Sequence, residues 1–169
     1  VLMSNLLTLA KLDEEIPLLT ETVNISDVAS ELLPVYAEEA QTRNLPFSVQ
    51  IEPDIVIQTN KDSFRQIMTI LLDNALKYTP QGGAVRLSLA RDGRHIQIIT
   101  ENTCDTSLEP NPERLFERFY RGDAARTQQK ESSGYGIGLS AARAICENFG
   151  GKLTAEYSSD DSIRFTARF

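Results

Sequence analysis

Two short segments of this sequence carry residue types that can hold a nucleoside triphosphate. Residues 73–80 read DNALKYTP, and residues 134–140 read GYGIGLS. Magnesium prefers hard oxygen ligands and usually shares the phosphates of its substrate, so a single amide oxygen such as that of Asn74 is a sufficient protein ligand. A glycine-rich turn that opens a helix brings backbone N–H groups close to phosphates. In this order, the two segments predict a site for Mg²⁺ and ATP.

Within the first segment, Lys77 follows Asn74 by one helical turn on the same face, where its ammonium group can reach the same phosphates. Tyr78 offers a ring that can cover the nucleotide. Taken alone, the segment also allows Asn74 to be a cap at the helix C-terminus.

The second segment has glycines at alternate positions, and glycine clusters of this kind also form ordinary turns. A dinucleotide-binding unit would need a strand before the glycines. Residues 127–133 are instead typical of a loop, which excludes that interpretation.

The elements that position these segments follow from hydrophobic periodicity, caps and turns. Helices are predicted over residues 25–43, 61–78 and 137–149; Asn24 caps the first, which Pro34 can kink, and Asn60 or Thr59 caps the second. Predicted strands cover residues 47–52, 55–59, 84–90, 95–101, 152–157 and 162–169, with a hairpin turn at Asp92-Gly93. Residues 102–112 and 122–133 are predicted loops, separated by a short helix that carries Leu115, Phe116 and Phe119. This order predicts an α/β (α+β) two-layer sandwich with a mostly antiparallel sheet.

The first fourteen residues form an apolar helical pattern. Leu2, Leu6, Leu9 and Ala10 lie close to one stripe, which Met3, Leu7 and Leu12 widen. We expect the tail of a longer helix that packs in a bundle or a dimer; the alternative is a helix packed on its own domain. The start at Val1 rather than Met also predicts a longer parent protein.

Length and composition exclude several other classes of protein. The 169 residues predict one domain with a short appendage, and the net charge of −7 argues against a nucleic-acid binder. Cys104, Cys146 and His95 cannot form a zinc site, so reduced thiols are expected. No apolar run approaches the roughly 20 residues of a membrane span.

Three segments together resemble the N, F and G2 boxes of sensor histidine kinases. They are residues 74–79 (NALKYT), 116–121 (FERFYR) and 134–140, and the similarity covers residues 24–169. It implies a Bergerat-type ATP-binding fold, with helices on one face of a mixed sheet, over residues 16–169. Residues 6–13 (LLTLAKLD) resemble the end of the dimerising, phosphoacceptor helical hairpin that precedes this domain in the family. Residues 1–15 are therefore expected to be the tail of that hairpin.

The resemblance also assigns roles. Asn74 would hold Mg²⁺, Lys77 and Arg121 would contact the phosphates of ATP, and residues 121–133 would form a lid over them. The full set of expected nucleotide contacts is Asn74, Lys77, Tyr78, Asn102, Asp105, Arg121, Gly134, Tyr135, Gly136, Ile137, Gly138 and Leu139.

Two departures from the family pattern are visible. The adenine-reading box is usually Asp-x-Gly-x-Gly, whereas residues 102–106 read NTCDT. The Asn102 oxygen can still accept a hydrogen bond from the adenine amino group, without charge assistance, and Asp105 could replace it after a loop shift. Ile70 occupies the position where relatives commonly carry Glu, Asp or Asn, and it cannot act as a base. Asp73 is then the nearby carboxylate that could have a catalytic role.

The leading hypothesis is a catalytic domain that transfers the γ-phosphoryl group of ATP to a histidine on the hairpin, and thence to the receiver domain of a response regulator. His95 begins a strand, so the fragment lacks its own acceptor. The full-length protein would be a homodimer, with this part as the cytoplasmic domain of a membrane-anchored sensor. One alternative is a nucleotide-binding regulatory module with weak or no kinase activity. Another, a serine kinase of the anti-sigma-factor type, is disfavoured by the leucine-rich N-terminus.

Overall fold

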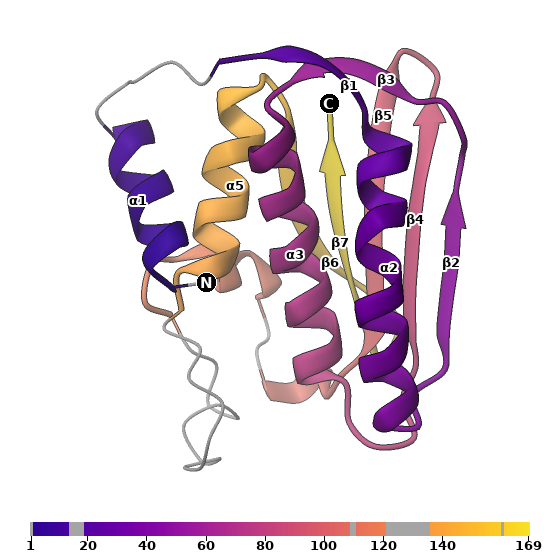
Figure 1. Cartoon of the computed structure of the whole chain (residues 1–169). Coiled ribbons are helices and arrows are strands. Elements are labelled where there is room, and N and C mark those ends of the chain that lie inside the picture. Colours follow the sequence, from indigo (N-terminus) through magenta and orange to yellow (C-terminus); the bar gives the residue numbers. More distant parts are fainter. Residues whose placement is uncertain (1, 14–18, 109–110, 121–135, 160) are drawn as a thin grey trace.

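A computed structural model of the chain shows helices packed on one face of a sheet (Figure 1). It describes residues 2–13, 19–108, 111–120, 136–159 and 161–169. Helices α2 (Ile25–Thr42), α3 (Lys61–Tyr78) and α5 (Gly138–Asn148) lie side by side on the sheet, and α1 (Leu2–Asp13) packs against α5. The predicted arrangement of helices on one face is confirmed.

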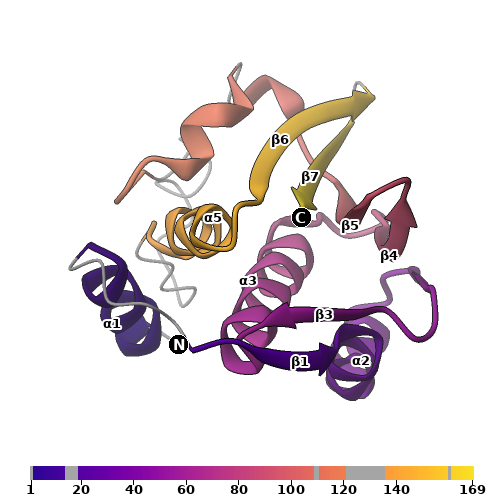
Figure 2. The ribbon, with the colours of Figure 1, turned by 90° about the horizontal axis from the view of Figure 1, so that it is seen from above.

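The main sheet has five strands in the order β2-β4-β5-β7-β6. Their bounds are β2 (Phe47–Ile51), β4 (Val85–Asp92), β5 (His95–Thr103), β6 (Lys152–Ser159) and β7 (Ser162–Arg168). Only the β2–β4 pair is parallel, so the sheet is mixed and mostly antiparallel, as predicted. Two further strands, β1 (Glu21–Asn24) and β3 (Val56–Thr59), form a separate antiparallel pair across the N-terminal ends of α2 and α3 (Figure 2).

Helix α3 is the centre of the core and has the bounds that its sequence predicts. Asn60 caps it by accepting a hydrogen bond from the Ser63 N–H at 2.9 Å. Its apolar side chains recur at helical spacing and contact α2, α5 and β5. The buried set comprises Phe64, Ile67, Met68, Ile70, Leu71, Leu72, Ala75 and Leu76. Helix α3 therefore has little freedom to shift, which makes it a firm support for the polar residues at its end.

Two predicted loop boundaries are wrong. Strand β5 continues to Thr103, so Asn102 lies within the sheet, because its neighbours Val85 and Ile163 extend the pairing on both sides. The short helix is a 3₁₀ turn, η2 (Pro112–Phe116), that does not include Phe119. Glu117 takes an extended conformation and ends it. A second 3₁₀ turn, η1 (Thr106–Leu108), follows β5.

Helix α1 packs through a face that includes Leu9 of the predicted stripe together with Asn5, which was not predicted. Asn5 and Leu9 are each only 5% exposed, whereas Met3 is 70% and Leu7 55% exposed. The Asn5 Oδ1 accepts a hydrogen bond from Gln66 Nε2 of α3 at 2.8 Å, which turns the Asn5 side of the helix inward. In this chain α1 therefore packs against α5, while Met3, Leu6 and Leu7 of the predicted stripe stay exposed.

In the parts of the chain that the structure describes, no helix has both the length and the apolar character needed to cross a membrane.

Candidate nucleotide-binding site

The last two turns of α3 carry the first group of predicted site residues. Ile70, Asn74 and Lys77 follow one another along one side of the helix. The C-cap of α3 is Thr79, so Asn74 lies inside the helix and is not its cap. Among the described residues the half-buried Asn74 amide has no hydrogen-bond partner. Its polar atoms are therefore available to a ligand.

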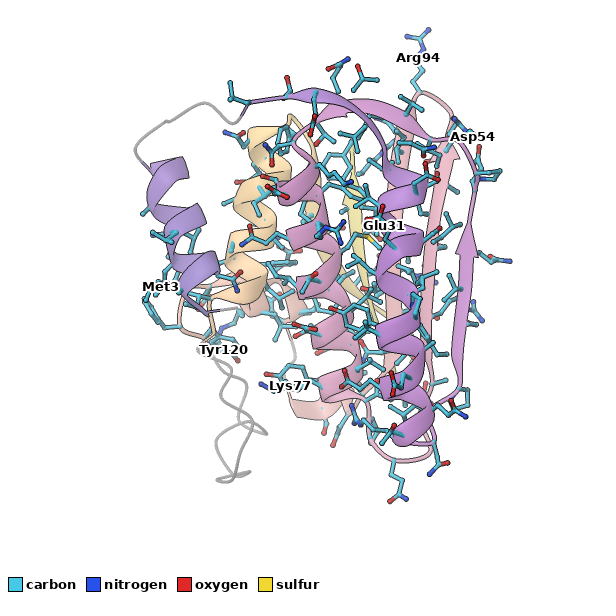
Figure 3. The ribbon with its side chains drawn as sticks, in the orientation of Figure 1. Met3, Glu31, Asp54, Lys77, Arg94 and Tyr120 are labelled. Carbon is cyan, nitrogen blue, oxygen red and sulfur yellow. The ribbon has the colours of Figure 1, made fainter. Side chains whose placement is uncertain are left out.

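Lys77 and Tyr78 lie at the end of the same helix. The Lys77 Nζ is 5.2 Å from the centroid of the Tyr78 ring, and that ring is 46% exposed. Figure 3 shows Lys77 and Tyr120 at the same end of the molecule. A cation and an exposed ring therefore stand beside Asn74, as the sequence predicts.

The N-terminus of α5 lies next to this part of α3. A Cβ atom on Gly138, the first residue of α5, would be 3.5 Å from Ile70 Cγ2. The N-cap is Ile137, whose side chain makes no capping hydrogen bond. The first N–H groups of a helix have no partner inside it, and the positive end of the helix dipole adds to their attraction for anions. This end of α5 can therefore bind a phosphate one helical turn from Asn74.

Gly136 links two segments through the backbone: the glycine segment, residues 134–140, and the F segment, residues 116–121. The Phe119 N–H donates to the Gly136 carbonyl at 2.8 Å. Gly136 has a φ of +68°, and a Cβ atom there would lie 2.6 Å from the Tyr120 carbonyl oxygen. Only glycine fits this position. Phe119 also has a positive φ, +64°, and its side chain is 69% exposed.

Arg143 of α5 fixes the other end of the F segment, a role that sequence analysis missed. Its guanidinium lies 3.6 Å from the centroid of the Phe116 ring and pairs with Glu113 at 2.5 Å. It also donates to the Leu153 carbonyl of β6 at 3.1 Å. One side chain thus connects α5, η2 and β6. No local pattern around Arg143 indicates these distant contacts.

The two predicted adenine-box residues differ sharply in environment. Asn102 is 2% exposed, and its Nδ2 donates to the Thr103 carbonyl at 3.0 Å. The buried Asn102 Oδ1 has no partner within the described part of the chain. A buried acceptor without a donor is costly, and the amino group of a base could satisfy it. Asp105 is exposed, and hydrogen bonds from the Ser107 hydroxyl and N–H lower its pKa.

Ile70 and Asp73 also have well-defined surroundings. Ile70 is 5% exposed and packs at the α3–α5 contact, where it has no proton to exchange. The Asp73 carboxylate accepts a hydrogen bond from the Tyr36 hydroxyl of α2 at 2.9 Å. Burial raises the pKa of Asp73, and the Tyr36 hydrogen bond partly opposes that shift. Asp73 is therefore held on the α2 side of α3.

Several predicted residues lie outside the described part of the chain. They are Arg121, Gly134, Tyr135 and the predicted lid, residues 121–133. Of the other glycine-segment residues, Ile137 is 3% exposed and Leu139 lies in the first turn of α5.

Comparisons with known proteins find a matching family and several relatives of this chain. Residues 59–169 match the family described as histidine kinase-, DNA gyrase B- and HSP90-like ATPases. The sensor protein RssA of Serratia marcescens is 36% identical over 160 residues, which are 92% of this chain and 33% of that protein. The sensor protein DltS of Streptococcus agalactiae is 31% identical over 164 residues, 96% of this chain and 40% of that protein. The probable sensor protein PcoS of Escherichia coli is 34% identical over 116 residues, 69% of this chain and 24% of that protein.

Solved structures share the fold. The Acinetobacter baumannii histidine kinase AdeS has a TM-score of 0.76 at 17% identity, covering 99% of this chain and 75% of that one. The mycobacterial sensor histidine kinase MprB has a TM-score of 0.72 at 23% identity, covering 88% of this chain and 97% of that one. At these identities the likeness concerns the fold.

We predict that Gly136→Ala destabilises the chain more than Gly150→Ala does. Gly150 has a φ of +71° and open space around it, so alanine there meets only the left-handed backbone cost of roughly 1–2 kcal/mol. Alanine at Gly136 meets that cost and also the Tyr120 carbonyl. Urea unfolding measures both variants. Equal losses of stability in the two variants would show that the backbone contact between Phe119 and Gly136 does not require glycine at position 136.

We predict that Asp73→Asn stabilises the chain near neutral pH. Burial raises the pKa of Asp73 in the folded state. Protonated Asp73 therefore contributes fully to the stability of the fold below the ordinary pKa of 3.8, and this contribution is lost as pH rises through the raised pKa. Asparagine keeps an acceptor for the Tyr36 hydroxyl and removes this titration. The stability difference from wild type, measured by urea unfolding, should therefore be larger near neutral pH than below pH 3.8.

Asp62→Asn is the control for this measurement. Asp62 lies in the first turn of α3, where the helix dipole favours a negative charge, so its removal should lower stability near neutral pH. A decrease of similar size for Asp73→Asn would contradict the environment assigned to Asp73.

Proposed function

Because this chain belongs to the family of histidine kinase-, DNA gyrase B- and HSP90-like ATPases, we propose that it is the ATP-binding catalytic part of a sensor histidine kinase. Residues 16–169 form the catalytic domain, and residues 1–15 are the tail of the hairpin that carries the phosphoacceptor. One observation carries the proposal: the Asn74 side-chain amide, which has no hydrogen-bond partner among the described residues, lies one turn along α3 from its contact with the N-terminus of α5.

The described residues fit Mg²⁺ and ATP. Asn74 supplies the hard oxygen that Mg²⁺ prefers, and Lys77 supplies a cation for the phosphates. When bound, Mg²⁺ neutralises charge on the phosphates. The N–H groups at the start of α5 would bind the phosphates, and the Asn102 Oδ1, which is buried without a partner among the described residues, would accept a hydrogen bond from the adenine amino group. Arg121, Gly134 and Tyr135 complete the proposed set from outside the described residues.

In the proposed reaction, an imidazole nitrogen of the acceptor histidine attacks the γ-phosphorus of ATP. A P–N bond forms, the bond to the β,γ-bridging oxygen breaks, and ADP leaves. The residues of this chain hold the phosphates in line and offset their charge, which is the main protein contribution to phosphoryl transfer. The acceptor comes from the hairpin, and the phosphoryl group then passes to an aspartate on a response-regulator receiver domain.

The chain spans 24–40% of the length of these three curated relatives, and we propose that the phosphoacceptor and sensing parts of the activity lie in a longer protein. We propose that this protein is a homodimer and that the present domain lies on the cytoplasmic side of a membrane-anchored sensor. The relatives are named as sensor proteins, which supports this setting.

A specific observation favours a second candidate, a nucleotide-binding regulatory module with little kinase activity. Ile70 is buried where a base would act, and the Tyr36 hydroxyl binds the nearby Asp73 carboxylate. ATP binding without transfer would fit this arrangement.

We expect Asn74→Asp to weaken Mg-ATP binding at least about tenfold, the equivalent of 1.4 kcal/mol. The added carboxylate places a negative charge beside the phosphates and alters the oxygen geometry for Mg²⁺. Isothermal titration of the 169-residue chain measures the effect. Asn148→Asp, the same exchange on an exposed residue of α5, is the control and should bind as wild type does. Equal affinities for Asn74→Asp and wild type would refute the assignment of Asn74.

We also expect phosphate from γ-labelled Mg-ATP to reach a histidine in a longer chain that includes the upstream hairpin. Phosphohistidine is acid-labile and base-stable, which identifies the product. No label despite measurable ATP binding would favour the regulatory module. Acid-stable label on serine would favour a serine kinase. If the chain binds no ATP at all, the kinase and the nucleotide-binding regulatory module are both rejected.

A further inference from the structure

The C-terminal end of α3 lacks one of its own backbone hydrogen bonds. In an α-helix the carbonyl of residue 76 accepts from the N–H of residue 80. Residue 80 is a proline and has no N–H to donate. Thr79 is already extended, with a ψ of 122°, as expected before proline. The helix therefore stops one turn after Asn74, and the Leu76 carbonyl lacks the N–H of residue 80 that would otherwise bond to it.

Arg43 supplies the missing donor from another helix. Its Nη1 donates to the Leu76 carbonyl, and its Nη2 donates to the Thr79 carbonyl at 3.0 Å. The Thr79 hydroxyl adds a bond to the Ala75 carbonyl at 2.6 Å. The planar guanidinium can make two directed bonds to two carbonyls, which an ammonium cannot reproduce with the same geometry.

The backbone of Arg43 is itself fixed. It is the C-cap of α2, and its N–H donates to the Glu39 carbonyl at 3.1 Å. Asn44 follows with a φ of +53°, and the Leu45 N–H closes on the Ala40 carbonyl at 2.9 Å. This left-handed ending is a common way to terminate a helix. Arg43 therefore reaches α3 from a rigid position.

The charge of Arg43 also suits its place. Helices α2 and α3 run in the same direction, and their C-terminal ends lie together at the lower end of the molecule in Figure 1. Each C-terminus carries a partial negative charge from the helix dipole. A guanidinium between them is attracted to both.

We propose that Arg43 is a positioning residue of the nucleotide site. It replaces the hydrogen bond lost to Pro80 and keeps the last turn of α3 helical, which holds Lys77 and Tyr78 in register with Asn74. Arg43 touches neither the nucleotide nor Mg²⁺ in this role. The inference rests on the proposed function, because it needs a nucleotide at the end of α3.

The test compares Arg43→Ala with Arg65→Ala in the 169-residue chain. Arg65 of α3 pairs with Glu31 of α2 at 2.5 Å, so it also links these two helices, but near their N-terminal ends. Mg-ATP affinity is measured by titration at a temperature where urea and thermal unfolding show each variant folded. Arg43→Ala should bind at least about tenfold more weakly than wild type. Arg65→Ala should bind within about twofold of wild type, because an exposed ion pair contributes little.

Two further measurements separate positioning from general stability. Added methylguanidinium should restore Mg-ATP affinity to Arg43→Ala and leave Arg65→Ala unchanged. Arg43→Lys, which keeps the charge and one donor direction, should recover part of the affinity, and it also serves if Arg43→Ala does not fold.

The possible failures are distinct. If wild type binds no Mg-ATP, the proposed function fails and the positioning role falls with it. If wild type binds and Arg43→Ala binds equally well, only the positioning role is overturned. If affinity falls but neither methylguanidinium nor Arg43→Lys restores any of it, Arg43 has a structural role alone, and the proposal is again rejected.

Discussion

A phosphate is attracted to the N-terminus of a helix and repelled by the C-terminus, and the proposed site combines one end of each kind. The N-cap of α5, Ile137, makes no side-chain capping hydrogen bond, so the first N–H groups of this helix can bind an anion directly. The end of α3 carries the opposite partial charge, so it can face a triphosphate only with cations beside it. Lys77 in the last turn and Arg43 behind that turn supply two positive charges at this end. In a chain with a net charge of −7, the placement of these cations matters more than their number.

The contact between α3 and α5 must also be tight, because both helices contribute to one ligand. Ile70 and Gly138 form that contact, and Gly138 has no side chain to hold the helices apart. Gly136 then links the start of α5 to the F segment through a backbone hydrogen bond. Arg143 connects the same segment to α5 from its other side. Residues 136–138 are thus connected both to the F segment and to α5.

Much of the fold could be predicted because its signals are local. The bounds of α3 follow from the Asn60 cap, the periodic apolar residues and Pro80, all within one stretch of chain. The β4–β5 hairpin follows in the same way from Gly93, whose φ is +61°. Strand β1 was not predicted, because Val23 is its only apolar residue, which leaves no alternating pattern, and the strand forms by pairing with β3.

The kind of ligand and the main residues of the candidate site could be predicted from the sequence, whereas several contacts that position those residues could not. Asn74 and Lys77 lie on the same side of one helix, α3, because they are separated by about one helical turn in the sequence. The burial of Asn5 in place of Leu6 and the positive φ of Phe119 depend on partners far along the chain. So does the reach of Arg43 to α3, since nothing near residue 43 shows that Pro80 leaves a carbonyl unsatisfied.

The polar and apolar residues around Asn74 set the character of the proposed chemistry. A carboxylate at position 70 would sit at a buried contact and would have to lose most of its hydration, whereas isoleucine fills that contact without such a cost. Burial raises the pKa of both Tyr36 and Asp73, so Tyr36 stays protonated and donates to the carboxylate. Asp73 therefore serves the packing of α2 on α3. Because isoleucine cannot act as a base and Asp73 is hydrogen-bonded to Tyr36, the proposed phosphoryl transfer has to depend on alignment and charge, and the proton of the acceptor imidazole has to leave by another route.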